Sequence, residues 1–155
     1  MVMSATFSEI IKSMVLSKGQ KQALDDLLPI AEIALEVDKS ELPIRPRTHS
    51  LICAPSGSGK SYLMKALGDI LDVPILHLNC SSWAPLGGKS EKTTWSSIVE
   101  FISAHSKGII VLDEIDKITS TNTDWLGHIR LEIYDLLDGR IPKSIEIEEE
   151  SSELW

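Results

Sequence analysis

The residues best suited to chemistry lie in one short glycine-rich stretch. Gly57 and Gly59 let the backbone wrap so that successive N–H groups point at phosphate oxygens. Lys60 supplies a mobile positive charge for the β- and γ-phosphates of a nucleotide, and the Ser61 hydroxyl is placed to bind Mg²⁺. Gly-Ser-Gly turns also occur in ordinary strand-to-helix loops, but here Gly-Lys-Ser follows in register. The stretch therefore predicts an ATP-binding loop made of Ala54, Pro55, Ser56, Gly57, Ser58, Gly59, Lys60 and Ser61.

A pair of acids forms the second candidate site. Asp113 and Glu114 stand at the end of the apolar run Ile109–Leu112, where a parallel sheet places its ligand sites. Asp113 would hold Mg²⁺ directly or through water, and Glu114 suits a general base that deprotonates an attacking water. Because these acids follow a phosphate loop, we predict Mg²⁺-dependent ATP hydrolysis with Glu114 and Lys60 as the catalytic residues.

Strands alternating with helices must position these residues. Ser50–Cys53 is expected to form a short buried strand before the loop, and Lys60–Leu71 a helix after it. Val73–Leu78 and Gly108–Leu112 are predicted as further strands, which indicates an α/β protein with a parallel sheet and covering helices. The other predicted elements are helices over 7–15, 20–37 (kinked or split at Pro29), 95–102 and 125–137, and an exposed hairpin strand over 141–147.

The composition narrows the class of protein. The chain has 155 residues, 43% of them hydrophobic, which is enough for one globular domain. Its net charge of −8 does not favour nucleic acid as a partner, although the residues leave that partner open. Cys53 and Cys80 fit no metal spacing, and we expect both to be buried reduced thiols. The sequence shows no signal peptide and no membrane span, so we expect a cytoplasmic protein.

Both motifs resemble those of the AAA+ ATPases. Ala54–Ser61 and Ile109–Lys117 carry the resemblance, and Leu112–Lys117 is most similar to the Clp-type and Lon-type protein unfoldases. Upstream, Lys18-Gly-Gln-Lys-Gln-Ala23 resembles the family's Gly-Gln box, which implies that Gly19 and Gln20 mark the adenine pocket. By position, Lys60 and Ser61 would bind phosphate and Mg²⁺, Asp113 would bind Mg²⁺, and Glu114 would activate water.

The resemblance also implies a fold and an assembly. It predicts a three-layer P-loop NTPase with a parallel sheet, the large subdomain of an AAA+ module. Residues 1–40 would form helices leading into the core, residues 41–140 the core with its Walker A and Walker B motifs, and residues 141–155 an acidic hairpin or tail. The family's sites lie between subunits, so a homo-oligomeric ring and a protein substrate are expected partners besides ATP.

The sequence departs from the AAA+ pattern in two places. Unfoldases grip a polypeptide with an aromatic residue in the loop after the second strand, but here Gly88 takes that position. We expect Trp83, the nearest aromatic, to cap the core. The family's strand order, 5-1-4-3-2, further requires a fourth and a fifth strand, sensor residues, an arginine finger and a helical lid that we do not find. The glutamates of Ile145–Glu150 exclude that segment as the buried fourth strand. We therefore expect the N-terminal part of a module, or one half of a split ATPase with a complementary chain.

Three functions remain open from the residues alone. The first is an ATPase that remodels a protein or nucleoprotein partner, and the Asp113–Glu114 pair favours it. The second is a nucleotide-gated binding module with little or no turnover, favoured by the missing sensor, finger and lid. The third is a small phosphoryl-transfer kinase, for which adjacent Asp and Glu at a strand end fit less well than they fit water activation.

Overall fold

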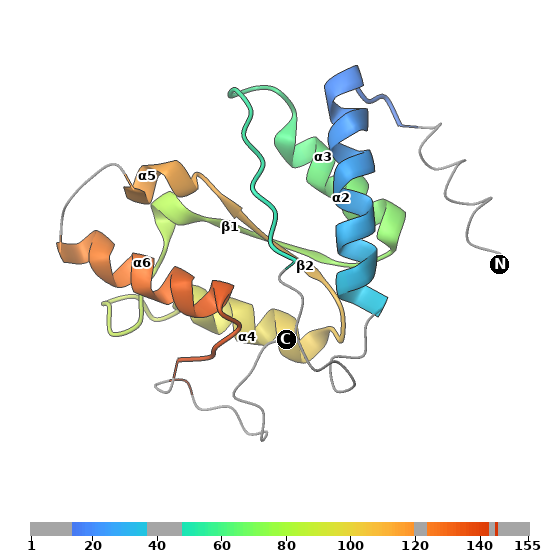
Figure 1. The fold of residues 1–155 in the computed structure, drawn as a ribbon. Helices are drawn as coiled ribbons and strands as arrows, with labels where there is room; N and C mark the ends of the chain where they lie inside the picture. Colours follow the sequence, from blue (N-terminus) through green and yellow to red (C-terminus); the bar gives the residue numbers. More distant parts are fainter. Residues whose placement is uncertain (1–13, 37–47, 120–123, 143–144, 146–155) are drawn as a thin grey trace. The chain divides into compact units, whose positions relative to one another are not determined.

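The computed structural model describes residues 14–36, 48–119, 124–142 and 145 (Figure 1). The chain divides into two compact units, each described below by itself. The first unit contains residues up to Ile75 together with Lys107–Ile109, and the second contains Leu76–Ser106 and the residues from Ile110 onward. Residues 7–13 of the helix expected near the N-terminus lie outside the described residues.

The described residues of the first unit contain two helices. Helix α2 (Lys18–Glu36) packs on helix α3 (Lys60–Leu71), and α2 buries Leu24 and Leu28 (Figure 1). The sequence predicts that Pro29 kinks or splits this helix, and the split is wrong, because one helix runs through Pro29. A proline removes one backbone hydrogen bond, and it leaves the carbonyl four residues earlier without its usual donor. Pro29 and Asp25 are both exposed, so water can satisfy that carbonyl and the helix continues.

Helix α3 has the bounds that the sequence predicts. Its buried face carries Leu63, Met64, Ala66, Leu67 and Ile70, at the spacing of an amphipathic helix. Gly68 belongs to the same face, where an added Cβ would lie 2.6 Å from Cδ1 of Ile75 and 3.1 Å from the Val73 carbonyl oxygen. The missing side chain therefore lets α3 approach the chain that enters the first strand.

The expected strand at Ser50–Cys53 is absent. These residues have no regular secondary structure, Leu51 is 78% exposed, and Cys53 is exposed as well. In the strand order that the AAA+ resemblance implies, this segment lies between the fourth and fifth strands. The described residues contain only two strands, and this segment is neither of them. An apolar segment without a neighbouring strand cannot satisfy its backbone groups in a sheet, so it stays irregular and exposed.

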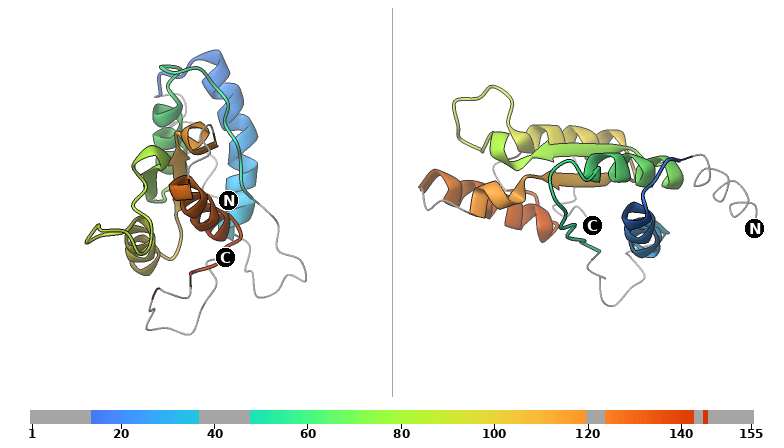
Figure 2. Two further views of the ribbon diagram at one scale, coloured as in Figure 1. Left: turned by 90° about the vertical axis from the view of Figure 1, so that its left-hand side faces the viewer. Right: turned by 90° about the horizontal axis from the view of Figure 1, so that it is seen from above.

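The second unit holds most of the sheet. Strands β1 (Ile75–Asn79) and β2 (Ile109–Asp113) lie side by side and run parallel, which confirms the α/β class with a parallel sheet (Figures 1 and 2). A short 3₁₀ helix, η1 (Cys80–Ser82), follows β1, and α4 (Thr94–Ala104) precedes β2. In the part of the chain that the structure describes, two helices follow β2. They are α5 (Ile115–Thr119), which the sequence did not predict, and α6 (Asp124–Leu137).

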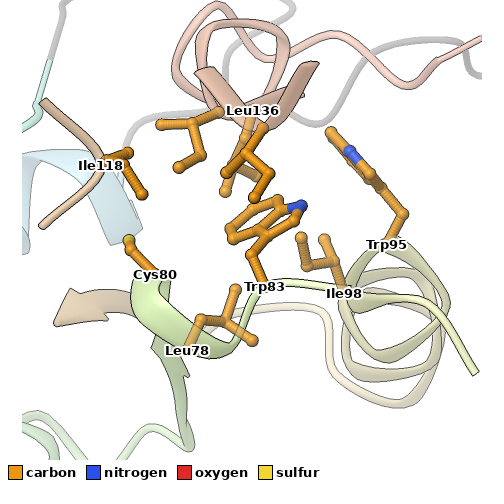
Figure 3. Packing of buried hydrophobic residues seen from close by; sticks show 9 residues of the cluster. Leu78, Cys80, Trp83, Trp95, Ile98, Ile118 and Leu136 are labelled. Atoms are coloured by element: carbon orange, nitrogen blue, oxygen red, sulfur yellow. The ribbon is translucent and has the colours of Figure 1, made fainter. Parts of the chain in front are cut away.

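The core of the second unit gathers buried side chains from β1, α4, α5, α6 and the turn after β1 (Figure 3), and partly buried residues of β2 pack against it. Trp95 and Ile98 of α4 are fully buried, as their helical spacing predicts. Trp83 is only 4% exposed, which confirms that it caps the core. The remaining members are Leu78, Cys80, Ile118, Ile129, Ile133 and Leu136. Helices α4, α5 and α6 all contribute side chains to one apolar cluster. This cluster supports both the end of β1 and the residues that follow β2.

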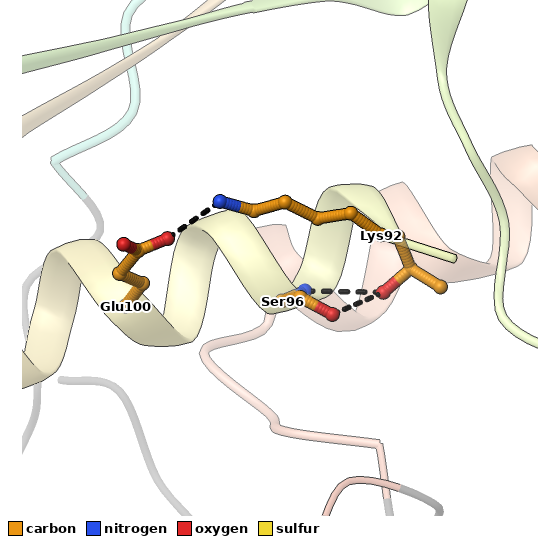
Figure 4. A network of polar contacts seen from close by, with 4 residues as sticks. Lys92, Ser96 and Glu100 are labelled. Carbon is orange, nitrogen blue, oxygen red and sulfur yellow. Dashed lines mark hydrogen bonds and ion pairs between the residues drawn. The ribbon is translucent and has the colours of Figure 1, made fainter. Parts of the chain in front are cut away.

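Local hydrogen bonds set the limits of α4 and α6. The Thr93 hydroxyl oxygen accepts the Ser96 N–H at 3.1 Å and caps α4 (Figure 4). The Lys92 ammonium contacts the Glu100 carboxylate at 2.7 Å, and this hydrogen bond lowers the pKa of Glu100. Gly139 has a φ of 72° and ends α6, as predicted. None of the described helices is both long and apolar enough to cross a membrane.

Candidate functional site

The phosphate-loop segment forms a tight turn that requires its glycines. Residues 56–58 turn, and the Ser58 N–H donates to the Pro55 carbonyl at 3.3 Å. Gly57 and Gly59 have φ values of 76° and 83°, in the left-handed region that glycine enters without steric cost. The two residues that the sequence singled out for backbone wrapping are therefore the ones that reverse the chain.

The loop leads directly into the first turn of α3. Gly59 is the N-cap residue and has no side chain with which to cap the helix, and the first turn contains no acid. The Lys60 ammonium folds over the loop and donates to the carbonyls of Ala54 at 3.0 Å and Pro55 at 3.1 Å. The Ser61 side chain is exposed. Backbone N–H groups, the positive end of a helix and an ammonium group thus gather in one place, which is the chemistry of an anion site.

Gln20 also contacts this loop. Its side-chain amide donates to the carbonyls of Ser58 at 3.4 Å and Gly59 at 3.2 Å. Gly19 is exposed, and no atom lies within 4 Å of the position of an added Cβ. The structure therefore brings Gln20 to the phosphate loop, a contact that the sequence analysis did not foresee, while a role in binding adenine stays a prediction for both residues.

The acid pair lies in the second unit, at the end of β2 as expected. Asp113 is the last residue of the strand, and its carboxylate accepts the Glu114 N–H at 2.9 Å. Glu114 has a φ of 57°, a left-handed conformation that residues with a Cβ rarely adopt. Both side chains are exposed. A left-handed backbone at a residue with a Cβ costs free energy, so it persists only where the surroundings hold the residue in place.

Two polar residues at the end of β1 hold the Glu114 carboxylate. The Ser81 hydroxyl lies 2.7 Å from Oε2 of Glu114 and 2.6 Å from Oδ1 of Asn79. Asn79 Oδ1 also accepts the Ser81 N–H at 2.8 Å, which fixes the turn after the strand. Hydrogen bonding by Ser81, and then by Asn79, lowers the pKa of Glu114. The Glu114 carboxylate is therefore kept ionised. Ser81 has one hydroxyl proton to donate, and an ionised carboxylate accepts it more strongly than the neutral amide of Asn79 does.

Sequence reasoning missed Asn79 and Ser81. The signal that could have found them is their place, since they are the first polar residues after an apolar strand that neighbours the Asp113 strand. Parallel strands bring their carboxyl ends to one edge of a sheet, so polar residues after adjacent strands meet there.

The donor chemistry fits Mg²⁺ without forming a metal cage. Within the described ranges, no group of three or more His, Cys, Asp or Glu residues gathers to hold a metal. Mg²⁺ usually takes one or two protein oxygens and completes its shell with phosphates and water. The Ser61 hydroxyl and the Asp113 carboxylate are each hard oxygen donors, and binding of Mg²⁺ by either stays a prediction.

The segment after η1 is anchored rather than loose. Glu132 of α6 is buried, and its two carboxylate oxygens accept the Trp83 indole N–H at 2.9 Å and the Leu86 N–H at 2.8 Å (Figure 3 shows Trp83 in the core). Ala84 and Thr94 exchange two hydrogen bonds of 2.9 Å that close the segment. The loop that the unfoldase resemblance predicts to grip a polypeptide is therefore held at its start by these hydrogen bonds.

Two arginines make local contacts, Arg130 within α6 and Arg140 just after this helix ends at Leu137. Arg130 donates from Nε to the Leu126 carbonyl at 3.3 Å, one turn earlier in the helix. Arg140 lies 3.7 Å from the Asp138 carboxylate.

The two cysteines differ, and the expectation that both are buried is wrong for Cys53. Cys53 is exposed because its segment is not part of the sheet, whereas Cys80 is 1% exposed, as expected. Burial, and then the charges of Asp113 and Glu114, raises the pKa of the Cys80 thiol to about 11.

We expect a thiol reagent at neutral pH to modify one cysteine in the native chain and both in denaturant. Cys53→Ser should abolish the reaction of the native chain with the reagent. Equal reactivity of the two thiols in the native chain would contradict the buried environment of Cys80.

Comparisons with known proteins identify the family of this chain. The model of the family described as "ATPase family associated with various cellular activities (AAA)" matches residues 50–143. A mitochondrial ATP-dependent clpX-like chaperone of Saccharomyces cerevisiae is 38% identical over 78 residues, which are 46% of this chain and 15% of that protein. The ATP-dependent Clp protease ATP-binding subunit ClpX 2 of Wolinella succinogenes is 31% identical over 90 residues, 54% of this chain and 21% of the relative.

The family match covers both candidate motifs. Residues 50–143 include the phosphate loop and the Asp113–Glu114 pair, and they make up more than half of the chain. Compared with the two ClpX relatives, the chain spans only about a fifth of their length or less. The chain belongs to the AAA family of ATPases, with the α/β fold of a P-loop NTPase and Clp-type relatives.

Proposed function

We propose that this chain binds ATP with Mg²⁺ and hydrolyses it. The observation that carries the proposal is the Glu114 carboxylate, which stands beside Asp113 at a strand end and is held ionised by Ser81. A protein that only binds nucleotide has no need of an oriented carboxylate next to its metal-binding acid. An ionised Glu114 can accept a proton from an attacking water, which is the work of a general base.

The proposal assigns a task to each residue of the motifs. The backbone of Pro55–Gly59 would surround the phosphates, and Lys60 would neutralise their charge. Ser61 and Asp113 would hold Mg²⁺, which supplies charge neutralisation at the phosphates when bound. Glu114 would orient and deprotonate water. The nucleotide-binding core would cover residues 41–140, with residues 1–40 leading into it.

We also propose that hydrolysis serves a protein partner. One relative is named a chaperone and the other a subunit of a protease, so a polypeptide substrate and a ring of identical subunits fit this family. A complementary chain could take the place of further subunits.

A second candidate is a nucleotide-gated binding module with little turnover. The burial of Trp83 favours it, because an aromatic residue that fills the core and donates to Glu132 does not grip a polypeptide. In that case ATP would control assembly with a partner rather than power threading.

Phosphate release separates the two candidates. We expect the purified chain to release phosphate from ATP in the presence of Mg²⁺ and to stop when Mg²⁺ is chelated. ATP binding without phosphate release, at any chain concentration that allows assembly, would favour the binding module and contradict hydrolysis.

The pH dependence of turnover tests the contact between Ser81 and Glu114. Because hydrogen bonds lower the pKa of Glu114, turnover should persist as the pH falls through the usual range of a glutamate and be lost only below it. Ser81→Ala removes the main donor, so the loss should move to higher pH. Ser82→Ala is the matched control, since the Ser82 hydroxyl donates only to the Asn79 carbonyl at 3.3 Å. Loss of turnover at the same acidic pH in Ser81→Ala and in the wild type would contradict the contact between Ser81 and Glu114.

A further inference from the structure

Gln20 makes two sets of hydrogen bonds with one side chain. At the start of its own helix, the side-chain carbonyl oxygen of Gln20 accepts the Ser17 backbone N–H at 2.8 Å. In return, the backbone N–H of Gln20 donates to the Ser17 hydroxyl at 3.3 Å. This reciprocal pair is a capping box, which fixes the start of α2. Its amide nitrogen is left over, and it donates to the carbonyls of Ser58 and Gly59.

These last two bonds set the direction of two peptide units in the phosphate loop. In a trans peptide the C=O and the following N–H point in opposite directions. Holding the Ser58 carbonyl toward Gln20 therefore turns the Gly59 N–H away from Gln20, and holding the Gly59 carbonyl turns the Lys60 N–H away in the same manner. Glycines with φ values of 76° and 83° do not keep such a shape by steric preference alone, because glycine also populates other conformations readily.

The packing around Gly59 supports the same role. A Cβ added to Gly59 would collide with the amide nitrogen of Gln20, so the two residues are in direct contact. The Gly59 carbonyl also accepts the Leu63 N–H at 3.0 Å, the first hydrogen bond of α3. Gln20 thus contacts the residue at which the loop ends and α3 begins.

We infer that Gln20 is a positioning residue for the nucleotide: it orients backbone N–H donors of the phosphate loop and couples the start of α2 to that loop. This inference rests on the proposed binding of ATP by Gly57–Ser61. It gives Gln20 a role at the phosphates, which is separate from any contact with adenine.

The capping box allows a substitution that separates the two roles. In Gln20→Glu a carboxylate oxygen can still accept the Ser17 N–H, since glutamate is a common residue at this position of the box. The other oxygen would face the carbonyls of Ser58 and Gly59, where no donor remains. We expect the dissociation constant of a fluorescent ATP analogue with Mg²⁺ to rise about tenfold or more, with little change in the melting temperature of the free chain.

Two control variants define the result. Gln22→Glu adds the same charge two residues along α2, where the native amide bonds only to Asp26 at 3.2 Å, and its affinity should stay within about twofold of the wild type at physiological salt. Ser17→Ala removes the hydroxyl of the box, so it should lower the melting temperature while leaving the affinity within about twofold.

Equal affinities of Gln20→Glu and Gln22→Glu would overturn the role of Gln20. If Gln20→Glu does not fold, Gln20→Met is measured instead, because it keeps the length of the side chain without its donor, and unchanged affinity would again overturn the inference. A wild-type chain that does not bind the analogue would overturn the proposed function itself. If the wild type binds and Lys60→Ala does not, while Gln20→Glu binds normally, only the inference about Gln20 fails.

Discussion

Glu114→Gln should lower the rate of ATP turnover by at least about 100-fold while leaving the affinity for ATP nearly unchanged. The amide keeps the size of the side chain and can still accept a hydrogen bond from Ser81, which lies 2.7 Å from the native carboxylate. It cannot accept a proton from water at neutral pH. The effect should therefore fall on the chemical step, and single-turnover phosphate release is the measurement that isolates it.

A matched control is Glu36→Gln, which removes one exposed carboxylate at the end of α2. It should turn over ATP at the wild-type rate. Equal turnover by Glu114→Gln and the wild type would exclude Glu114 as the general base.

Glu132→Ala should lower the free energy of unfolding by about 2–4 kcal/mol, the largest stability effect that we expect from a single polar side chain. The substitution leaves two donors of the buried core, the Trp83 indole N–H and the Leu86 N–H, without their acceptor. It also leaves a cavity beside Trp83. Urea unfolding followed by tryptophan fluorescence measures the change, because Trp83 itself reports on this part of the core.

Glu132→Gln separates the two causes. Glutamine fills the same volume but offers one acceptor in place of two, so its loss should lie between the wild type and Glu132→Ala. Glu100→Ala serves as the control, since that carboxylate is exposed and its contact with Lys92 is a surface ion pair (Figure 4). Unfolding of Glu132→Ala at the wild-type urea concentration would contradict the account of the buried carboxylate.

The sequence predicts best those elements that local patterns determine. The amphipathic spacing of α3, the apolar run of β2 and the glycine after α6 each act within a few residues, and the structure confirms all three. The turn at residues 56–58 is of the same kind, because Gly57, Gly59 and Lys60 lie within four residues of one another. The burial of Trp95 and Ile98 likewise follows from one helical stripe.

Elements that depend on distant partners could not be predicted in this way. Ser50–Cys53 has the apolar residues of a strand, but a strand forms only where a neighbour accepts its hydrogen bonds, and no pattern within four residues reports whether that neighbour is there. The exposure of Cys53 follows from the same cause. The hydrogen bond from Ser81 to Glu114 joins residues 33 positions apart, and that from Gln20 to Gly59 joins residues 39 apart. Such contacts require the three-dimensional arrangement of each unit.

The central claim is that Ala54–Ser61 binds the phosphates of ATP. Its most direct test is a titration of the 155-residue chain with a fluorescent ATP analogue and Mg²⁺, in parallel with Lys60→Ala. We expect saturable binding by the wild type and a loss of affinity of at least about 100-fold in the variant, because the ammonium that neutralises the phosphates is gone. Binding of equal strength by the two chains would contradict the assignment of the phosphate loop.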